Sequence, residues 1–132
     1  WDLLQSAMST PLVTNQIEIS VMETAAFTNG DLAHLQRHRI PPMAWSPLGG
    51  GALFKSPAPS VVVKMQEVAN RLGTDLATLA YAWLLAHPAK IVPVIGTNSI
   101  ARIQAIQNLD TIEIDRETWF EIYEAALGQP VP

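Results

Sequence analysis

The sequence contains no cysteine, few charged residues and no long hydrophobic run. Without cysteine, the chain cannot form a disulfide or a cysteine-based zinc or redox site. The chain has 8 Lys and Arg against 12 Asp and Glu, a net charge of −4, which argues against binding to nucleic acid or to an anionic membrane surface. The most apolar stretch, residues 76–86, is well short of the roughly 20 residues that span a bilayer.

The length and the hydrophobic content are those of a folded protein. The chain has 132 residues, of which 48% are hydrophobic, so it is long enough for one domain with a real core and too hydrophobic to be disordered. Residues 1–20 contain no basic segment and no cleavage pattern of a signal peptide, so we expect a cytoplasmic protein. Because the first residue is Trp1, we expect a processed chain or a piece of a longer polypeptide.

Strands and helices alternate along the sequence. Period-two alternation or continuous apolar character predicts three strands, at residues 12–20, 43–48 and 89–96. Helical spacing and end signals predict helices at residues 1–8, 31–39, 60–72, 74–87, from Thr97, Asn98 and Ser99 to about Asn108, and 116–127. Such alternation is typical of parallel βαβ units. Three strands do not complete a sheet, and a (β/α)₈ barrel needs about 250 residues. We therefore predict a single incomplete α/β domain over residues 1–132.

The three predicted strands differ in character. In residues 12–20, successive side chains point to alternate faces of the strand. Val13 is the first residue of one face. The other face is entirely polar, which suits the inside of a barrel or the floor of a site. Residues 89–96 are nearly all apolar, as in a buried parallel strand. The helices at 60–72 and 74–87 have wide apolar faces and are expected to pack against the sheet.

Several residues are expected to end helices. Asp31 and Asp115 stand where N-caps belong, and Gly128 follows the last predicted helix as a C-terminal cap. His87 comes at a helix end and is expected to act there as a cation or cap.

Ligands of parallel α/β folds bind at the carboxyl ends of the strands. One candidate is the segment from Thr97 to Arg102, where a cation in the first turn of a helix is disfavoured by the helix dipole unless an anion lies nearby. This pattern indicates a phosphate pocket; the alternative is a solvated arginine, paired with a surface carboxylate.

Two other segments lie at the same edge. Trp45 and the glycines at 49–51 follow the second strand, where an aromatic ring can stack on a flat ligand and glycines permit close backbone approach. The alternative is a plain turn with a core tryptophan. Gln16, with Glu18, lies on the polar face of the first strand, either in a site or as ordinary barrel-interior packing.

Two histidines have the spacing of metal ligands. His34 and His38 are four residues apart on one predicted helix. No glutamate follows the first histidine, and Arg37 and Arg39 add like charge, so the pattern favours a solvated face over a metal site.

Taken together, four motifs resemble the C-terminal part of an aldo-keto reductase. They are TNQIEIS at 14–20, MAWSPLGGGALF at 43–54, IVPVIGTNSIARI at 91–103 and AALGQPVP at 125–132. The tail and the AWSPLGGG form resemble the YdhF-like branch of bacterial oxidoreductases. The resemblance covers the whole chain and implies strands six to eight of a partial TIM (β/α)₈ barrel, in a family that uses NADPH to reduce small carbonyl compounds.

The resemblance also implies roles for individual residues in cofactor binding. Gln16 matches the glutamine that binds the nicotinamide carboxamide, and Trp45 matches the aromatic residue that stacks on the nicotinamide. The segment that wraps the pyrophosphate is represented by Ser46, Leu48 and Gly50.

The adenosine 2′-phosphate site of the family matches Thr97, Asn98 and Arg102, whereas Gly96 stands where many members have lysine. The family's catalytic Tyr, Lys, Asp and His match no residue of this chain, because they belong to sequence that precedes Trp1. We therefore expect a cofactor-binding portion of an NADP-dependent oxidoreductase that does not reduce carbonyls alone.

The alternative is a truncated, non-catalytic half-barrel that acts as an interaction or regulatory module. A barrel cut after its fifth strand has two open strand edges and an uncovered inner face, so we expect self-association through those edges.

Overall fold

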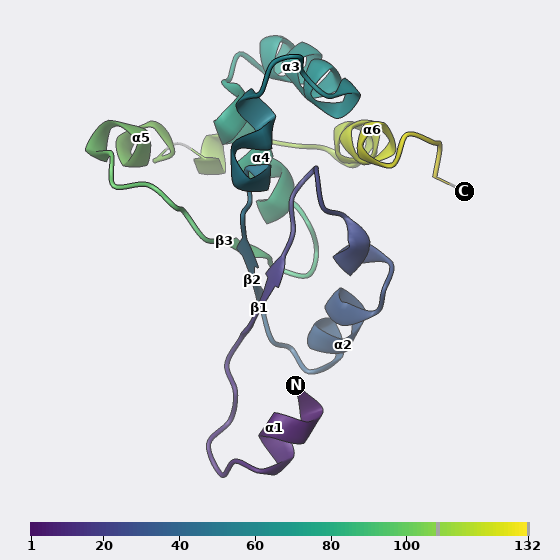
Figure 1. The fold of residues 1–132 in the computed structure, drawn as a ribbon, viewed down its shortest axis with the longest axis vertical. Coiled ribbons are helices and arrows are strands. Elements are labelled where there is room, and N and C mark those ends of the chain that lie inside the picture. The colour runs from purple at the N-terminus through teal and green to yellow at the C-terminus, as the bar shows by residue number, and fades with distance from the viewer. Residues whose placement is uncertain (108, 132) are drawn as a thin grey trace.

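The computed structural model describes residues 1–107 and 109–131. Three parallel strands form one sheet in the order β1 (Asn15–Glu18), β2 (Pro42–Trp45) and β3 (Val92–Pro93). The helices are α1 (Asp2–Ser6), α2 (Asp31–Arg37), α3 (Ser60–Leu72), α4 (Leu76–Leu85), α5 (Ile100–Ala105) and α6 (Arg116–Leu127). Short 3₁₀ turns occur at Ala25–Phe27, Gly49–Phe54 and Leu109–Thr111. The predicted partial α/β barrel, with three parallel strands and flanking helices, is confirmed (Figure 1).

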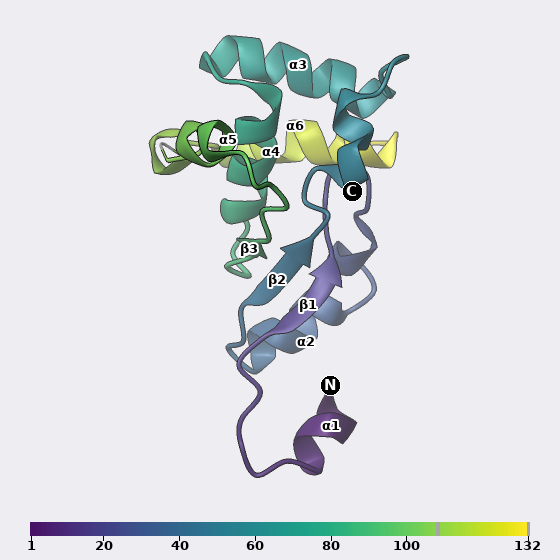
Figure 2. The same ribbon diagram turned by 60° about the vertical axis from the view of Figure 1, so that its left-hand side comes forward.

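The two faces of the sheet have different environments. Gln16 is paired with Met43, and Glu18 with Trp45, so these four side chains share one face. Gln16 and Trp45 are exposed on it, as expected for the inner face of an incomplete barrel. On the opposite face, the alternate residues Ile19 and Ala44 are buried in a core to which Leu32 of α2 also belongs. One face is therefore covered by helices, and the other is open (Figure 2).

The strands are shorter than predicted. Val13, expected to share a face with the core residues of the first strand, is 76% exposed because it precedes β1. Only Val92 and Pro93 of the third predicted strand pair with β2. The N–H of Val94, next to Pro93, donates to the carbonyl of Ala44 at 2.8 Å, so the missing N–H of Pro93 faces the outer edge and not β2. The expectation that residues 89–96 form a fully buried strand is wrong, because Val92 is 44% exposed and Ile95 is also exposed.

Helices α3, α4, α5 and α6 lie above one end of the sheet, whereas α1 and α2 lie toward the other end (Figure 2). Helix α4 packs against β3, as predicted, whereas α3 lies mainly against α6 and α4, so the expected packing of both helices on the sheet holds for α4 only. An ion pair between Arg71 Nη2 and Glu121 Oε2, 2.6 Å apart, also joins α3 to α6.

The ends of the helices follow the sequence signals with two differences. The Asp115 side chain accepts the N–H of Thr118, and Gly128 ends α6 in the left-handed region, both as predicted. The N-cap of α2 is Gly30 rather than Asp31: the left-handed backbone of Gly30 starts the helix, and the Asn29 side chain accepts the N–H of Asp31. Helix α5 ends at Ala105, earlier than predicted, and the predicted end at Asn108 lies outside the described residues.

An aromatic cluster holds α4 to α6. The indole N–H of Trp83 donates to the carbonyl of Trp119 at 3.1 Å, and that of Trp119 donates to the carbonyl of Trp83 at 3.0 Å. The two rings are stacked with centroids 5.1 Å apart, and Phe27 packs edge-on against both. This reciprocal pairing satisfies both buried indole donors while burying large apolar rings.

His87 lies at the edge of this cluster and is not the cation expected from the sequence. Its ring packs against Phe27 and Trp119, and its Nδ1 accepts the N–H of Ala89 at 3.1 Å. Burial lowers the pKa of His87 below its ordinary value of 6.5. His87 is therefore neutral at pH 7 and fixes the turn between α4 and β3.

The lowered pKa of His87 predicts a loss of stability in acid. In the unfolded chain His87 binds a proton below about pH 6.5, whereas the folded chain binds it only at lower pH, so the free energy of unfolding falls as the pH drops through this window. Urea unfolding at pH 7.5 and at pH 5.5 measures the change. In His87→Asn, whose amide oxygen can accept the same N–H without titrating, the decrease should be smaller; an equal decrease would contradict the prediction.

No helix in the described part of the chain is both long enough and apolar enough to cross a bilayer.

Candidate functional site

A cavity of about 770 Å³ lies where β2 and β3 end and α4 begins. Six of the eight residues predicted to bind a cofactor line it: Trp45, Ser46, Leu48, Gly50, Thr97 and Arg102. These residues come from two segments that are about 50 positions apart in the sequence, and the parallel pairing of β2 with β3 brings them to one edge of the sheet. The structure therefore assembles most of the predicted site.

The segment after β2 turns sharply at the mouth of the cavity. Ser46 has a positive φ of 49°, which is uncommon for a residue with a side chain. Gly49, Gly50 and Gly51 follow with φ of 61°, 59° and 88°, a conformation that glycine adopts at little cost. This run of left-handed residues lets the backbone line the cavity directly.

The three glycines are needed for different reasons. A Cβ on Gly49 would lie 2.6 Å from Cγ of Met22, whereas a Cβ on Gly50 or Gly51 would meet no atom within 4 Å. Gly49 therefore permits close packing of the turn on the core, and the other two permit only the left-handed backbone.

This difference predicts unequal effects of alanine. We expect Gly49→Ala to destabilise the chain by about 1 kcal/mol more than Gly73→Ala, since the second site has a similar φ of 66° but open space around it. Urea unfolding of the two variants measures the difference directly. Equal losses would show that Met22 yields freely to the added methyl group.

Arg102 reaches the cavity from α5. The Ser99 hydroxyl accepts the N–H of Arg102, and the Thr97 hydroxyl accepts the N–H of Ser99, so two side chains fix the start of this short helix. The guanidinium is exposed and forms no ion pair with any described residue. The alternative expected from the sequence was an arginine paired with a surface carboxylate. No carboxylate in the described part of the chain pairs with Arg102.

Helix α4 contributes residues that the sequence interpretation missed. Asp75, Thr78 and Tyr81 are spaced three apart and all line the cavity. Their spacing places them on one helical face, which is the signal that could have revealed them. Burial raises the pKa of Tyr81, and the nearby charge of Arg102 lowers it by less, so the phenol is neutral and can donate a hydrogen bond.

Asp75, the acidic residue of this group, caps the start of α4. Desolvation alone would raise the pKa of Asp75, but hydrogen bonds from the Thr78 hydroxyl and from the N–H groups of Thr78 and Ala77 outweigh it and lower the pKa. Asp75 is therefore ionised and its oxygens are engaged in capping α4.

Gln16 and Asn98 do not line the cavity. Gln16 is exposed on the open face of the sheet, where it pairs with Met43, two residues before Trp45. Asn98 is exposed beside Thr97. Gln16 therefore lies on the same open face as Trp45. Asn98 lies in the segment that carries Arg102, outside the cavity lining.

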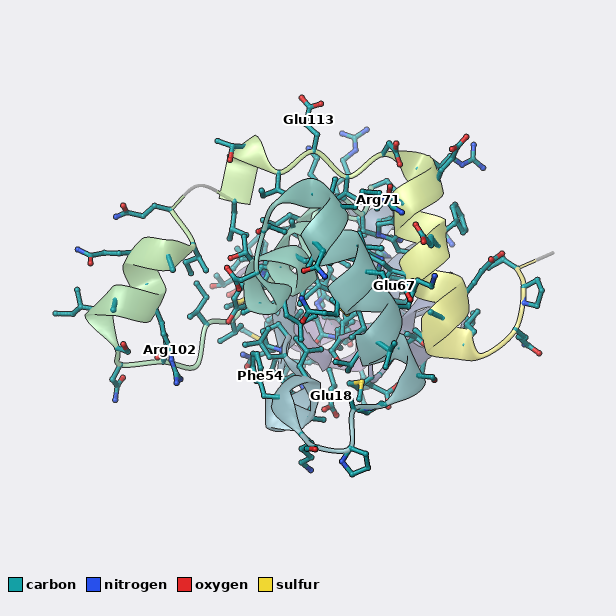
Figure 3. The ribbon with its side chains drawn as sticks, turned by 90° about the horizontal axis from the view of Figure 1, so that it is seen from above. Glu18, Phe54, Glu67, Arg71, Arg102 and Glu113 are labelled. Carbon is teal, nitrogen blue, oxygen red and sulfur yellow. The ribbon has the colours of Figure 1, made fainter. Side chains whose placement is uncertain are left out.

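A second cavity, of about 700 Å³, lies between the end of α4 and residues 107–115. Two of its lining residues, Glu113 and Asp115, are acidic, and none of the described residues that line it is basic. In Figure 3, Glu113 points outward at a different edge of the molecule from Arg102 and Phe54. The charge of this cavity is unsuited to an anionic ligand, whereas Arg102 makes the first cavity suited to one.

Comparisons with known proteins identify the family of the chain. The family model described as "Aldo/keto reductase family" matches residues 1–126. The chain is 53% identical to 6-dehydroglucose reductase of Agrobacterium fabrum over 99% of its length, and 39% identical to oxidoreductase YdhF of Escherichia coli over 98%. It covers 45% and 44% of those relatives, so it spans under half their length.

A solved structure supports the fold. The crystal structure of a thermostable aldo-keto reductase in complex with the inhibitor epalrestat superimposes with a TM-score of 0.82 at 19% identity, over 94% of this chain and 43% of that one. The fold of this solved structure and the family match agree with each other. The chain belongs to the aldo/keto reductase family, and it corresponds to less than half of the relatives it matches.

Proposed function

We propose that this chain supplies the NADPH-binding portion of an aldo-keto reductase site. The observation that carries the proposal is the cavity in which an aromatic ring, a left-handed glycine turn and the Arg102 guanidinium meet at the carboxyl ends of β2 and β3. Its volume of about 770 Å³ lies within the range of pockets that bind small molecules and cofactors.

The chemistry of the lining residues fits a phosphorylated dinucleotide. Arg102 offers a guanidinium that can form charge-assisted hydrogen bonds with a 2′-phosphate, and the Thr97 hydroxyl lies in the same segment. The neutral Tyr81 phenol adds a donor, while Asp75 is held by the N-cap of α4. These features support NADP over a ligand without phosphate.

The other end of the cavity suits a flat ring. Trp45 is half-exposed there and offers a stacking surface to a nicotinamide ring. Ser46, Leu48 and Gly50 line the path between Trp45 and the arginine segment, where a pyrophosphate would lie. Gln16, which lies on the same open face and pairs with Met43 two residues before Trp45, would hold the carboxamide. The bound cofactor would supply the hydride for reduction of a carbonyl group.

A complete aldo-keto reductase that contains these residues would reduce a small carbonyl compound. The 53% identity with a protein named 6-dehydroglucose reductase supports a substrate such as 6-dehydroglucose. The proton donor and its partners belong, by resemblance to the family, to barrel segments that these 132 residues do not match. We therefore expect this chain alone to bind cofactor without catalysing reduction.

Calorimetry and an activity assay test the two halves of this proposal together. NADPH titrated into the chain should bind saturably with one site, and the same preparation should not oxidise NADPH when a small aldehyde is added. Absence of binding at millimolar NADPH would overturn the cofactor assignment. Steady oxidation of NADPH by the chain alone would overturn the assignment of the acid–base groups to other segments.

A second function is favoured by the open face and the strand edges. Strands β1 and β3 are the outer strands of the sheet, and the exposed apolar residues Trp45 and Val92 lie on its open face. An unpaired strand edge beside an apolar face promotes association. We therefore expect the chain to self-associate: sedimentation velocity should show a mass above 14.4 kDa that rises with concentration, and a monomer at all concentrations would contradict this.

A further inference from the structure

Three potential metal ligands from two helices converge at the end of the molecule opposite the cavity. Asp2 of α1, and His34 and His38 at the end of α2, each offer a ligand atom, and these atoms lie within 4.8 Å of one another. Figures 1 and 2 both show the first turn of α1 next to α2. The sequence showed only the two histidines; the carboxylate comes from about 30 residues away.

The backbone fixes the two histidines one helical turn apart. The N–H of His38 donates to the carbonyl of His34 at 3.2 Å, and the ring centroids are 4.7 Å apart. Leu32 and Leu35 are buried, so α2 is anchored to the core and the histidine pair is carried on a fixed support. Histidines at this spacing can bind one metal ion together.

His34 and Asp2 are in close contact without a hydrogen bond between them. His34 Nε2 lies 3.2 Å from Asp2 Oδ1, yet this nitrogen is inaccessible to solvent and makes no acceptable hydrogen bond with any described residue. Two ligands of a tetrahedral zinc ion, with bonds of about 2.0–2.1 Å, are about 3.3 Å apart. The observed separation therefore matches one edge of a zinc coordination tetrahedron, and the nitrogen has no hydrogen-bond partner among the described residues.

The surroundings of the cluster are compatible with a cation. The indole of Trp1 packs on both imidazoles, with centroids 5.7 Å and 5.3 Å away, and covers one side. The histidines lie at the C-terminal end of α2, where the carbonyl groups favour positive charge. Arg37 and Arg39 are exposed, so solvent screens their repulsion.

We propose that Asp2, His34 and His38 form a binding site for a divalent transition-metal ion of the zinc type. Two neutral imidazoles and one carboxylate provide three of four tetrahedral ligands, and water would complete the set. The three ligand atoms lie within 4.8 Å of one another, which is longer than the edge of a zinc tetrahedron. His38 is exposed, so its ring can rotate to bring its nitrogen closer to the other two ligand atoms. The site would join α1 to α2, two elements that are otherwise connected through Trp1.

Histidine NMR tests the proposal with an internal control, because the chain has only three histidines. In long-range ¹H–¹⁵N spectra, ZnCl₂ added to metal-free protein should shift the ring nitrogens of His34 and His38 with one-to-one saturation and leave His87 unchanged. No shift at millimolar zinc would overturn the proposal, and so would equal shifts of all three rings.

A carboxylate variant separates a three-ligand site from a simple histidine pair. Outer-sphere partners of metal ligands contribute about 10–100-fold to affinity, so loss of a direct ligand in Asp2→Asn should weaken zinc binding by at least about tenfold. The matched control Asp31→Asn removes a carboxylate at the other end of α2 and should leave the affinity unchanged. Unaltered binding by Asp2→Asn, or equal losses in both variants, would overturn the three-residue site.

Discussion

Trp83→Ala is expected to lower the free energy of unfolding by about 3–5 kcal/mol, the range typical of a large aromatic residue lost from a core. Trp83 is completely buried, stacks on Trp119 and exchanges two hydrogen bonds with it. Its removal leaves a cavity and also deprives the Trp119 carbonyl of its indole donor. A loss of this size is a large fraction of the stability of an ordinary domain.

Urea unfolding followed by circular dichroism measures this effect. Trp45→Ala is the matched control, because Trp45 is 42% exposed at the cavity and belongs to no buried hydrogen-bond pair; it should cost about 1 kcal/mol or less. If the two tryptophans prove equally important for stability, the aromatic cluster is not the link that holds α4 to α6.

Arg102→Ala is expected to weaken NADPH binding by roughly 10–100-fold, which corresponds to the loss of charge-assisted hydrogen bonds of about 1.5–3 kcal/mol. The guanidinium lines the cavity and forms no ion pair with a described residue, so its removal should affect the ligand more than the fold. Binding of NADH, which lacks the 2′-phosphate, should change little. The ratio of the two affinities, measured by calorimetry, reports the role of this residue.

Arg116→Ala provides the matched control for charge. Arg116 lies over the ring of Phe120 on α6 and does not line the cavity, yet its removal changes the net charge by the same amount. Its NADPH affinity should equal that of the unaltered chain. Equal losses for NADPH and NADH in Arg102→Ala would contradict a role in binding the 2′-phosphate.

Most of the fold could be predicted from the sequence, because the local signals for helix ends agree with the tertiary structure. Asp115 and Gly128 mark the ends of α6, and Gly73 ends α3, because each residue supplies a cap or a left-handed backbone that helix ends require. The apolar spacing of α3 and α4 was likewise visible. The lengths of the strands could not be predicted, since the pairing of β3 depends on its neighbour β2.

The residues of the candidate site that belong to motifs directly after the strands could be predicted from the sequence. The residues that α4 contributes to the cavity could not. Trp45, Gly50 and Arg102 belong to motifs that follow strands, and the structure brings them together. Tyr81 lies on a helix whose apolar character concealed its contribution to the cavity. His87 was misjudged because its charge depends on burial among aromatic rings, which the sequence does not display.

The central claim is that the cavity beyond β2 and β3 holds the cofactor. It is tested most directly by mapping NADPH onto a ¹⁵N-labelled sample of this chain. Saturable shifts should be concentrated in the backbone amides of residues 45–51 and 94–102, with those of residues 109–115 unaffected. Shifts confined to residues 109–115, or none at millimolar NADPH, would contradict the account.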